Sequence, residues 1–346
     1  MKLGVLVGYS GKQVMLPLDL IRRAESLGYE SAWTAEAYGS DAVTPATWIL
    51  AQTDKIKVGT AIMQMPARTP ACTAMTAMTL NQLSGGRFLL GIGPSGPQVV
   101  EGWHGVAYGR PLTRTREYVE ILRKIMAREA PVELDGYHYQ LPYRGADSTG
   151  LGKPLKSILA ADSSIPIYAA SITPKGVETA AGVADGFFPV WMNPERYDLF
   201  AEPIAAGFAA RADGKAREDF EIMPFVTVMM GDDLEQCRMV AKAGLALYIG
   251  GMGARSKNFY NDYAIRLGYE ADAKVIQDLY LDGKQGEATH AVPDQLVDDI
   301  YLCGPKERIV ERLEAWKEAG RQGHVTQMLL ACRQPEALEA IAQAVL

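Results

Sequence analysis

The sequence predicts a (β/α)8 TIM barrel, an α/β fold in which parallel strands alternate with helices. Short, almost continuously apolar strands alternate with helical patterns along the chain, which is typical of parallel strands covered by helices. The strands number eight, which favours a closed barrel over the alternative, an open doubly wound sheet. We expect a single domain, 1–346, with insertions at about 131–164 and 232–300.

The first half of the chain repeats the strand and helix unit four times. Its expected strands are KLGVLVG at 2–8, ESAWTA at 30–35, IKVGTAIM at 56–63 and RFLLGIG at 87–93. Its expected helices lie at 18–28, 44–53, 71–86 and 114–128. Gly28 and the pair Gly85-Gly86 stand where the first and third helices end, as glycine commonly does.

The repeat is interrupted at 131–164 by a segment rich in glycine, proline and aromatic residues, with a hairpin expected around Asp135-Gly136. The remaining expected strands are IPIYAAS at 165–171, DGFFPV at 185–190, FEIMPFVTVMM at 220–230 and HVTQMLLA at 324–331. The expected helices between them begin at Pro174, Pro194 and Pro305. Residues 232–300 read as polar helices without a strand.

Composition excludes several classes of protein. A net charge of −6 and a pI near 5.4 argue against binding a polyanion, so we expect no nucleic-acid partner. The apolar runs fall short of the roughly 20 residues that span a bilayer. The run after Met1 is too short for a secretory signal, so we expect no membrane association and a cytoplasmic protein.

The metal-binding residue types are scattered. Cysteines 72, 237, 303 and 332 form no CxxC pair and read as small buried hydrophobes. Histidines 104, 138, 290 and 324 lack the spacing that would put two ligands on one helix face. We therefore expect no metal.

Two strand ends stand out because the active site of such a barrel lies at the carboxyl ends of its strands. In SAWTAEAYGSD, Glu36 follows the second strand as either a solvated acid or a pocket acid. In VGTAIMQMP, the small residues Gly59, Thr60 and Ala61 leave the backbone bare at the end of the third strand. Such a backbone suits a bulge or a flat ligand, although core packing accounts for it equally well.

GIGPSG at 91–96 matches the dinucleotide fingerprint GxGxxG after a strand. Pro94 and Pro97 bracket it, and the next helix is expected only near Thr113, so a nicotinamide site is disfavoured. The long loop that follows is either a packed surface loop or a ligand wall that contains Ser95, Trp103 and His104, a potential proton donor.

Two segments could bind an anion. SITPKG offers Thr173 as a helix cap, Pro174 at the first helical position and Lys175 beside them, so it is either an anion site or an ordinary capped helix. GGMGARSKNFY at 250–260 reads better as a solvated linker. There is no GxSxG motif and no strand-end lysine in the first six strands, which favours a cofactor that brings its own chemistry.

WTAEAYGSD, VGTAIMQMPARTPACTAMTAMTLNQLSGGRFLLGIG, SGPQVVEGWHG, TREYVEILRKIM, ADGFFPVWMNPERY and LCGPKERIVERL together resemble the bacterial luciferase-like superfamily. Within it, the chain is most similar to actinobacterial oxidoreductases that depend on the deazaflavin coenzyme F420. The resemblance implies a luciferase-like TIM barrel with insertions, and hydride transfer between F420 in the barrel mouth and a small organic substrate.

The resemblance also implies roles for individual residues. A non-prolyl cis peptide between Ala61 and Ile62 would press on the back of the deazaflavin ring, with Glu36 beside the ring. The expected cofactor contacts are Glu36, Ala61, Ile62, Gln64, Gly93, Ser95, Ile172, Thr173, Lys175 and Gly176, the last four as the phosphate loop. Glu36 and His104 are the expected catalytic residues, and Tyr9 and Trp103 would line the substrate side.

One departure limits the resemblance. The sugar-phosphate dehydrogenases of the superfamily carry a histidine after the strand-two acid and a glutamate after strand four, where this chain has Ala37 and Gly96. Their substrate and proton relay are not carried over. The alternatives are an FMN-dependent luciferase-like monooxygenase and a barrel that binds cofactor without catalysis, and a homodimer is expected from the resemblance.

Overall fold

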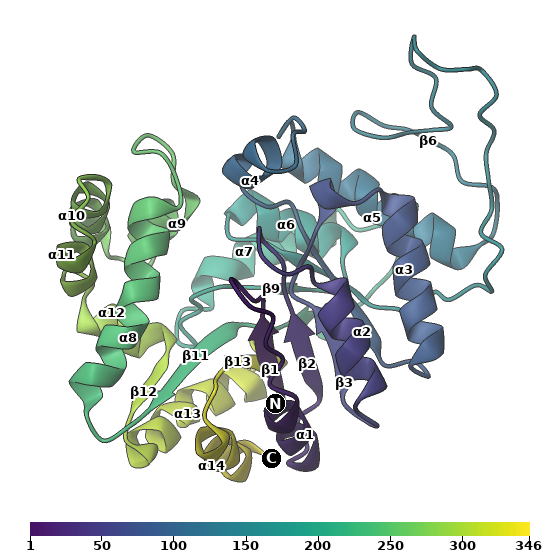
Figure 1. Cartoon of the computed structure of the whole chain (residues 1–346). Coiled ribbons are helices and arrows are strands. Elements are labelled where there is room, and N and C mark those ends of the chain that lie inside the picture. Colours follow the sequence, from purple (N-terminus) through teal and green to yellow (C-terminus); the bar gives the residue numbers. More distant parts are fainter.

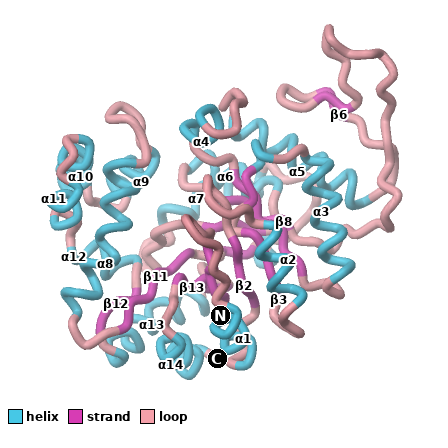
Figure 2. Tube along the Cα trace, viewed as in Figure 1, coloured by secondary structure: helices cyan, strands magenta, loops and turns pink.

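The computed structural model describes all 346 residues, and its strands form the predicted barrel (Figures 1 and 2). Every strand pair in the barrel is parallel, and the order around it follows the chain. The strands are β1 (Lys2–Gly8), β2 (Ser31–Thr34), β3 (Lys57–Thr60), β5 (Phe88–Gly93), β8 (Ile167–Ala170), β9 (Gly186–Phe188), β10 (Glu221–Ile222), β11 (Phe225–Met230) and β13 (Gln327–Ala331).

The barrel closes through a strand that is split in two. β10 pairs with β9 and β11 pairs with β13, while only Met223 and Pro224 separate them. Proline has no N–H to donate to a ladder, which accounts for the break. An isolated bridge between Val190 and Phe225 joins the two sides of the break.

Helices cover the outside of the barrel, as Figure 1 shows. Most lie where the apolar stripes predict them, and the last one follows β13 and was not predicted. They are α1 (Leu18–Ser26), α2 (Val43–Ala51), α3 (Pro70–Leu83), α5 (Pro111–Ala127), α6 (Pro174–Val183), α7 (Asp198–Ala209), α13 (Lys306–Arg321) and α14 (Pro335–Val345). None of the chain's helices is long and apolar enough to cross a membrane.

The core has two parts. A cluster of 74 buried residues packs the strands against the helices, and a cluster of seven, which includes Trp33, Tyr168 and Phe188, forms a separate group. A Cβ at Gly59 would lie 2.3 Å from Cζ3 of Trp33. The bare backbone at Gly59 is therefore required by core packing.

The first insertion is a hairpin followed by a long excursion. Its strands β6 (Leu134–Asp135) and β7 (Gln140–Leu141) are antiparallel and confirm the predicted hairpin. The buried carboxylate of Glu117 on α5 accepts hydrogen bonds from three consecutive hairpin N–H groups, those of residues 137–139, at 2.7–3.2 Å. The chain beyond the hairpin extends away from the barrel (Figure 1).

The second insertion is helical, as predicted. It leads into a strand that was not predicted. Its elements are α8 (Leu234–Ala246), a π-helix (Leu247–Gly251), α9 (Phe259–Arg266), α10 (Glu270–Leu281), α11 (Gln285–His290) and α12 (Asp294–Ile300). β12 (Leu302–Gly304) then pairs with β11 on the side away from β13. Three residues give too short a pattern for the sequence to reveal it.

Two further differences concern the barrel mouth. A short helix, α4 (Pro97–Gly102), lies inside the long loop where none was predicted, and α5 begins at Pro111 rather than near Thr113. Gly96 is the N-cap residue of α4 and stands directly before its first helical residue. The predicted third strand is divided into β3 and β4 (Met63–Gln64), and β4 pairs with the end of β5.

Candidate functional site

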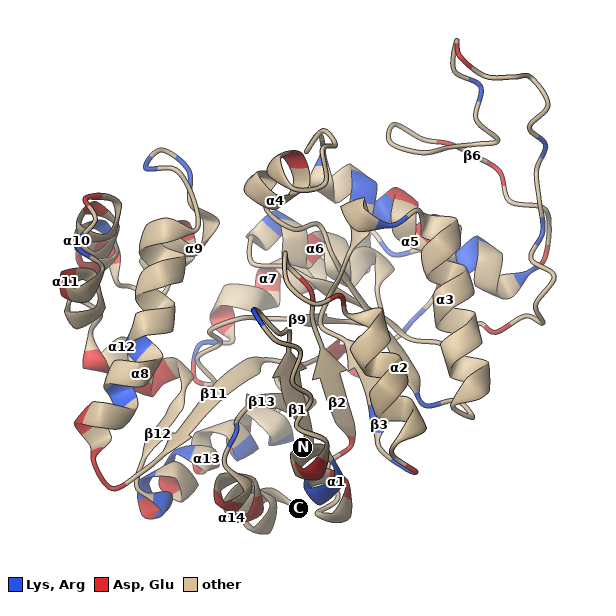
Figure 3. Cartoon of the chain, viewed as in Figure 1, with Lys and Arg blue, Asp and Glu red and all other residues tan.

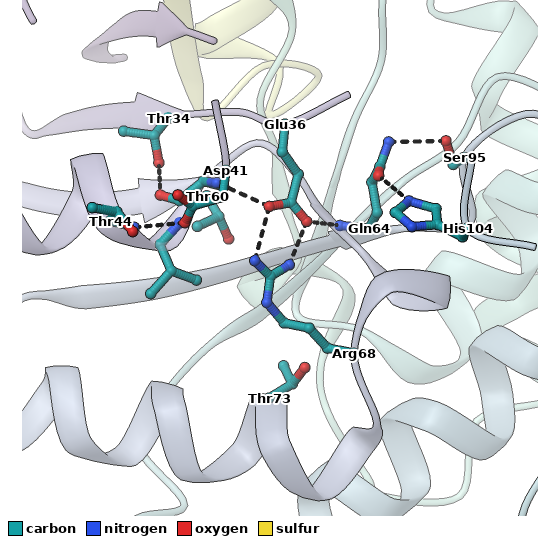
Figure 4. Close-up of polar contacts among 12 residues, drawn as sticks. Thr34, Glu36, Asp41, Thr44, Thr60, Gln64, Arg68, Thr73, Ser95 and His104 are labelled. Atoms are coloured by element: carbon teal, nitrogen blue, oxygen red, sulfur yellow. Dashed lines mark hydrogen bonds and ion pairs between the residues drawn. The ribbon is translucent and has the colours of Figure 1, made fainter. Parts of the chain in front are cut away.

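Glu36 joins three segments at the carboxyl ends of the strands (Figure 4). Its carboxylate accepts hydrogen bonds from the backbone N–H of Ala42 at 2.9 Å and of Gln64 at 2.7 Å. Arg68 pairs with both oxygens, and its Nη2 lies 3.0 Å from Oε2. The Glu36 side chain is only 6% exposed. Glu36 is therefore a buried, fully engaged acid that fixes the loop after β4.

Gln64 lies at the centre of a second set of polar contacts. Its side-chain amide donates to Oγ of Ser95 at 3.2 Å, and its Oε1 lies 2.7 Å from Nε2 of His104 (Figure 4). Because a carbonyl oxygen only accepts, this arrangement assigns the proton of neutral His104 to Nε2. The other ring nitrogen, Nδ1, then has a lone pair available to accept a proton.

The backbone between these two sets has the predicted cis peptide between Ala61 and Ile62. Gly93 lies opposite, where a Cβ would come within 2.8 Å of Cδ1 of Ile62. Ser95, two residues further on, has a φ of 61°. The structure thus brings together Glu36, Ala61, Ile62, Gln64, Gly93, Ser95 and His104.

Arg68 is a site residue that the sequence reasoning missed. It is the only charged residue between Lys57 and Arg87, and this isolation in an uncharged stretch is the signal that could have revealed it. Burial acts to lower the pKa of Arg68, but the hydrogen bonds and negative charge of Glu36 outweigh that effect and raise it. The guanidinium therefore stays charged and cancels the charge of Glu36.

The loop before α6 has the predicted cap. Oγ1 of Thr173 accepts a hydrogen bond from the N–H of Gly176 at 3.1 Å. Lys175 differs from the expectation, because its side chain is 76% exposed and pairs with Glu178 at 2.6 Å. The cation that reaches this loop is Arg266 of α9, which donates to the carbonyl of Ile172 and whose buried Nε has no partner.

The two residues assigned to the substrate side lie apart from these contacts. Tyr9 is 45% exposed, and its ring packs beside the loop after β2, where a Cβ at Gly39 would lie 3.2 Å from Cδ2 of Tyr9. Trp103 follows α4 and is 66% exposed. Trp103 makes no hydrogen bond to Gln64 or Ser95.

The arrangement suits a planar ligand rather than hydrolysis. The mouth contains the cis peptide, the ion pair of Glu36 and Arg68 beside it, and the hydrogen-bonded side chains of Gln64, Ser95 and His104. It also contains the start of α6, where the Nε of Arg266 has no partner. No serine or cysteine is paired with His104, so no nucleophile is activated there. The residues present can orient a bound group and exchange a proton at His104.

Comparisons with known proteins identify relatives of the whole chain. The chain is 42% identical, over 99% of its length and 98% of the relative's, to a protein of Mycobacterium tuberculosis with the provisional name coenzyme F420-dependent oxidoreductase. Two solved structures share the fold. One is the coenzyme F420-dependent tetrahydromethanopterin reductase of Methanopyrus kandleri, with a TM-score of 0.77, 21% identity and coverage of 99% and 98%.

The other is an F420-dependent secondary alcohol dehydrogenase in complex with an F420-acetone adduct, with a TM-score of 0.75, 20% identity and coverage of 99% and 98%. At these identities the two structures establish the architecture alone. The sequence profile of the family described as luciferase-like monooxygenase matches residues 10–323, which is most of the chain. The chain therefore belongs to the luciferase-like monooxygenase family.

Proposed function

We propose that the chain is a coenzyme F420-dependent oxidoreductase that transfers a hydride between the deazaflavin, bound in the barrel mouth, and a small organic substrate. The observation that carries this proposal is the 42% identity, along nearly the whole of both chains, to a relative named for that cofactor. The contacts of Gln64 with Ser95 and His104 support it, because they bring three polar side chains together at the carboxyl ends of the strands.

The side chains around the cis peptide fit the ring of the cofactor. Gly93 leaves the backbone open beside Ile62, and the amides and hydroxyls of Gln64 and Ser95 can hydrogen-bond to ring substituents. Glu36 has no free hydrogen-bonding direction left after its contacts with Ala42, Gln64 and Arg68. Glu36 therefore acts on the cofactor by holding Gln64 in place.

The start of α6 fits the phosphate of the cofactor. The helix start carries partial positive charge, and the N–H of Lys175 is free because Pro174 has no N–H and that of Gly176 bonds to Thr173. The buried Nε of Arg266 lacks a partner, so a phosphate oxygen there would satisfy it. Ile172, Thr173 and Gly176 remain in the proposed site, while Lys175 contributes at most long-range charge.

F420 supplies two-electron hydride chemistry when it is bound. The task of the chain is then to hold the ring and substrate in contact and to manage a proton. His104 is the group placed to do so, because Gln64 fixes its Nε2 and leaves Nδ1 available. Glu36 and Arg68 are positioning residues in this mechanism.

A turnover assay tests the proposal against a barrel that binds cofactor without catalysis. Reduced F420 is mixed with the chain and a panel of ketones, aldehydes, enones and quinones, and the return of the oxidised cofactor is followed by absorbance. We expect at least one acceptor to be reduced. If the cofactor binds and no acceptor oxidises it, the non-catalytic alternative is correct.

A homodimer is proposed on the basis of two uncharged helices. Neither α2 nor α3 contains a charged residue, and both are tan along their lengths in Figure 3. Trp48 on α2 and Met75 and Cys72 on α3 are exposed, contrary to the expectation that all the cysteines are buried. Exposed apolar side chains on neighbouring uncharged helices are typical of an interface.

A further inference from the structure

Four aromatic side chains from separate parts of the chain form one cluster. Trp191 follows β9, Tyr248 lies in the π-helix, and Tyr260 and Tyr263 lie on α9. The ring centroid of Trp191 is 5.3 Å from that of Tyr260, 6.1 Å from that of Tyr248 and 6.3 Å from that of Tyr263. Tyr248 and Tyr260 meet edge to face at 4.7 Å. Contacts between aromatic side chains thus join the second insertion to the barrel.

The backbone is unusual at two points of this cluster. Trp191 has a φ of 49°, in the left-handed region that a bulky residue rarely adopts. Tyr248 lies in a π-helix, a rare form that is frequently found at functional sites. Such backbone conformations cost free energy, persist only where the surrounding contacts hold them, and cluster at functional sites.

Buried amides hold the π-helix in position. Nδ2 of Asn258 donates to the carbonyls of Tyr248 at 3.1 Å and Ile249 at 2.9 Å. Nδ2 of Asn261 donates to the carbonyl of Ile249 at 3.2 Å. These bonds satisfy carbonyls that the irregular helix leaves free and fix Tyr248 beside Tyr260. The segment GGMGARSKNFY therefore contributes Asn258 to this support, while its residues 254–257 are exposed, as expected of a solvated linker.

Two more tyrosines complete the surface from the barrel side. Tyr9 follows β1, and Tyr38 stands two residues after Glu36 in the loop against which the Tyr9 ring packs. Burial is the main cause that raises the pKa of Tyr248, and Tyr9 and Tyr38 act in the same direction. Burial likewise raises the pKa values of Tyr9 and Tyr260. The raised pKa values keep the phenols of Tyr9, Tyr248 and Tyr260 neutral at physiological pH.

The basic side chains near the cluster are already engaged. Arg255 pairs with Asp278 and Asp282, and Lys257 pairs with Asp262 at 2.9 Å. Arg266 lies over the Tyr263 ring at 5.0 Å and donates to the carbonyl of Ile172, and its remaining Nε is the one proposed to bind the cofactor phosphate. A charged substrate group beside the rings would lose hydration without gaining a partner among these cations.

On the basis of the proposed function, we propose that Tyr9, Tyr38, Tyr248 and Tyr260 form the substrate wall, and that this wall selects flat, uncharged carbonyl or hydroxyl compounds over phosphorylated or carboxylated ones. The ring faces supply apolar contact. The neutral hydroxyls donate to a carbonyl oxygen or accept from an alcohol. Trp191 and Tyr263 support the wall from behind.

Calorimetric titration tests the wall with 1-tetralone, a flat ketone, and 2-naphthoate, a carboxylate of similar size. The titrations are run on the chain alone and on the chain pre-equilibrated with oxidised F420. We expect 1-tetralone to bind at least about tenfold more tightly than 2-naphthoate, because an unpaired carboxylate is costly to bury. Equal affinities, or no binding of 1-tetralone, would overturn the proposal.

Variants of the wall tyrosines test whether 1-tetralone binds at the proposed wall. We expect Tyr248→Ala and Tyr260→Ala each to weaken 1-tetralone binding about tenfold through lost ring contact, and the Phe variants about fivefold or less through one hydrogen bond. The control is Tyr143→Phe, an exposed tyrosine on the first insertion, which should leave binding unchanged. Unchanged binding by the Ala variants, with circular dichroism spectra like that of the parent, would refute the wall.

Cofactor binding is measured separately in the same samples, from F420 absorbance after ultrafiltration. If F420 fails to bind while 1-tetralone selectivity and its loss in the variants persist, the proposed function is wrong and the wall stands. If F420 binds and 1-tetralone is bound without regard to Tyr248 and Tyr260, the wall is wrong and the proposed function stands.

Discussion

Glu36 and Arg68 form a two-pronged ion pair at the mouth of the barrel, with side chains that are 6% and 19% exposed. The pair ties the end of β2 to the segment after β4, and the cis peptide lies between the two points of attachment. Removing one partner would leave the other charge buried without compensation. The pair is therefore a support on which the rest of the site depends.

Replacing Glu36 with Gln should lower the free energy of unfolding by about 3 kcal/mol, because it leaves the Arg68 charge unpaired. It should also weaken cofactor binding, since Gln64 loses a charge-assisted hydrogen bond. Urea unfolding followed by circular dichroism measures the first effect. The control is Glu314→Gln, which breaks an exposed pair with Lys317 and should cost less than about 0.5 kcal/mol. Equal stability of the two variants would contradict a supporting role for Glu36.

His104→Gln should lower kcat about a hundredfold, the lower range for a positioned acid or base, and change KM little. The matched control is His290→Gln on α11, which lies on the surface and should keep the parent kcat. Steady-state rates with reduced F420 and one accepted substrate give the kcat and KM of each variant. A kcat for His104→Gln close to that of His290→Gln would remove His104 from the chemistry.

Arg266→Met should weaken F420 binding about tenfold at low salt, as loss of a charge-assisted phosphate contact. Lys175→Ala should change it less than about twofold, because Lys175 is exposed and bonded to Glu178. Fluorescence titration of each variant with F420 distinguishes the two basic residues. A larger effect of Lys175 than of Arg266 would restore the original assignment from the sequence.

Asp185 should make the stability of the chain depend on acid pH. Burial acts to raise the pKa of Asp185, but Arg123, Lys215 and the N–H of Ile167 outweigh it and lower the pKa below its usual value. Its contribution is complete above its unfolded pKa, near 4, and is lost as the pH falls through the folded pKa. Urea unfolding of the parent at pH 6 and pH 3 should show a decline that Asp185→Asn reduces. An equal decline in both proteins would refute this role.

Met75→Glu and Trp48→Glu should convert the proposed homodimer into monomers, because a carboxylate would be buried in an apolar interface. Val240→Glu, at an exposed position on α8, is the control and should not change the assembly. Sedimentation velocity gives the mass of each protein. A monomeric parent chain, or dimers that persist in both α2 and α3 variants, would exclude this interface.

The sequence predicted the barrel because alternation of apolar strands with helical stripes is a local property. It also placed Glu36 and the bare backbone at strand ends, and the resemblance located the cis peptide that the structure has at Ala61–Ile62. It did not reveal β12, which has three residues, or α4, which follows Pro97 within a loop. Elements this short carry too little periodicity to stand out.

The parts of the site that were missed depend on contacts between distant segments. Lys175 belongs to the proposed phosphate loop, but the cation that bonds to this loop, Arg266, lies 94 residues from Ile172 in the sequence. Arg68 meets Glu36 across 32 residues, and Trp191 meets Tyr248 and Tyr260 only after the second insertion folds onto the barrel. Nothing in local spacing predicts which of several arginines or tyrosines will make such contacts.

The central claim is tested most directly by titrating the purified chain with F420 and with FMN under the same conditions. We predict that F420 binds at least about tenfold more tightly than FMN, a difference of about 1.4 kcal/mol, and that Arg266→Met reduces the affinity for F420. FMN binding tighter than F420 binding would contradict the proposed function and favour the FMN-dependent monooxygenase.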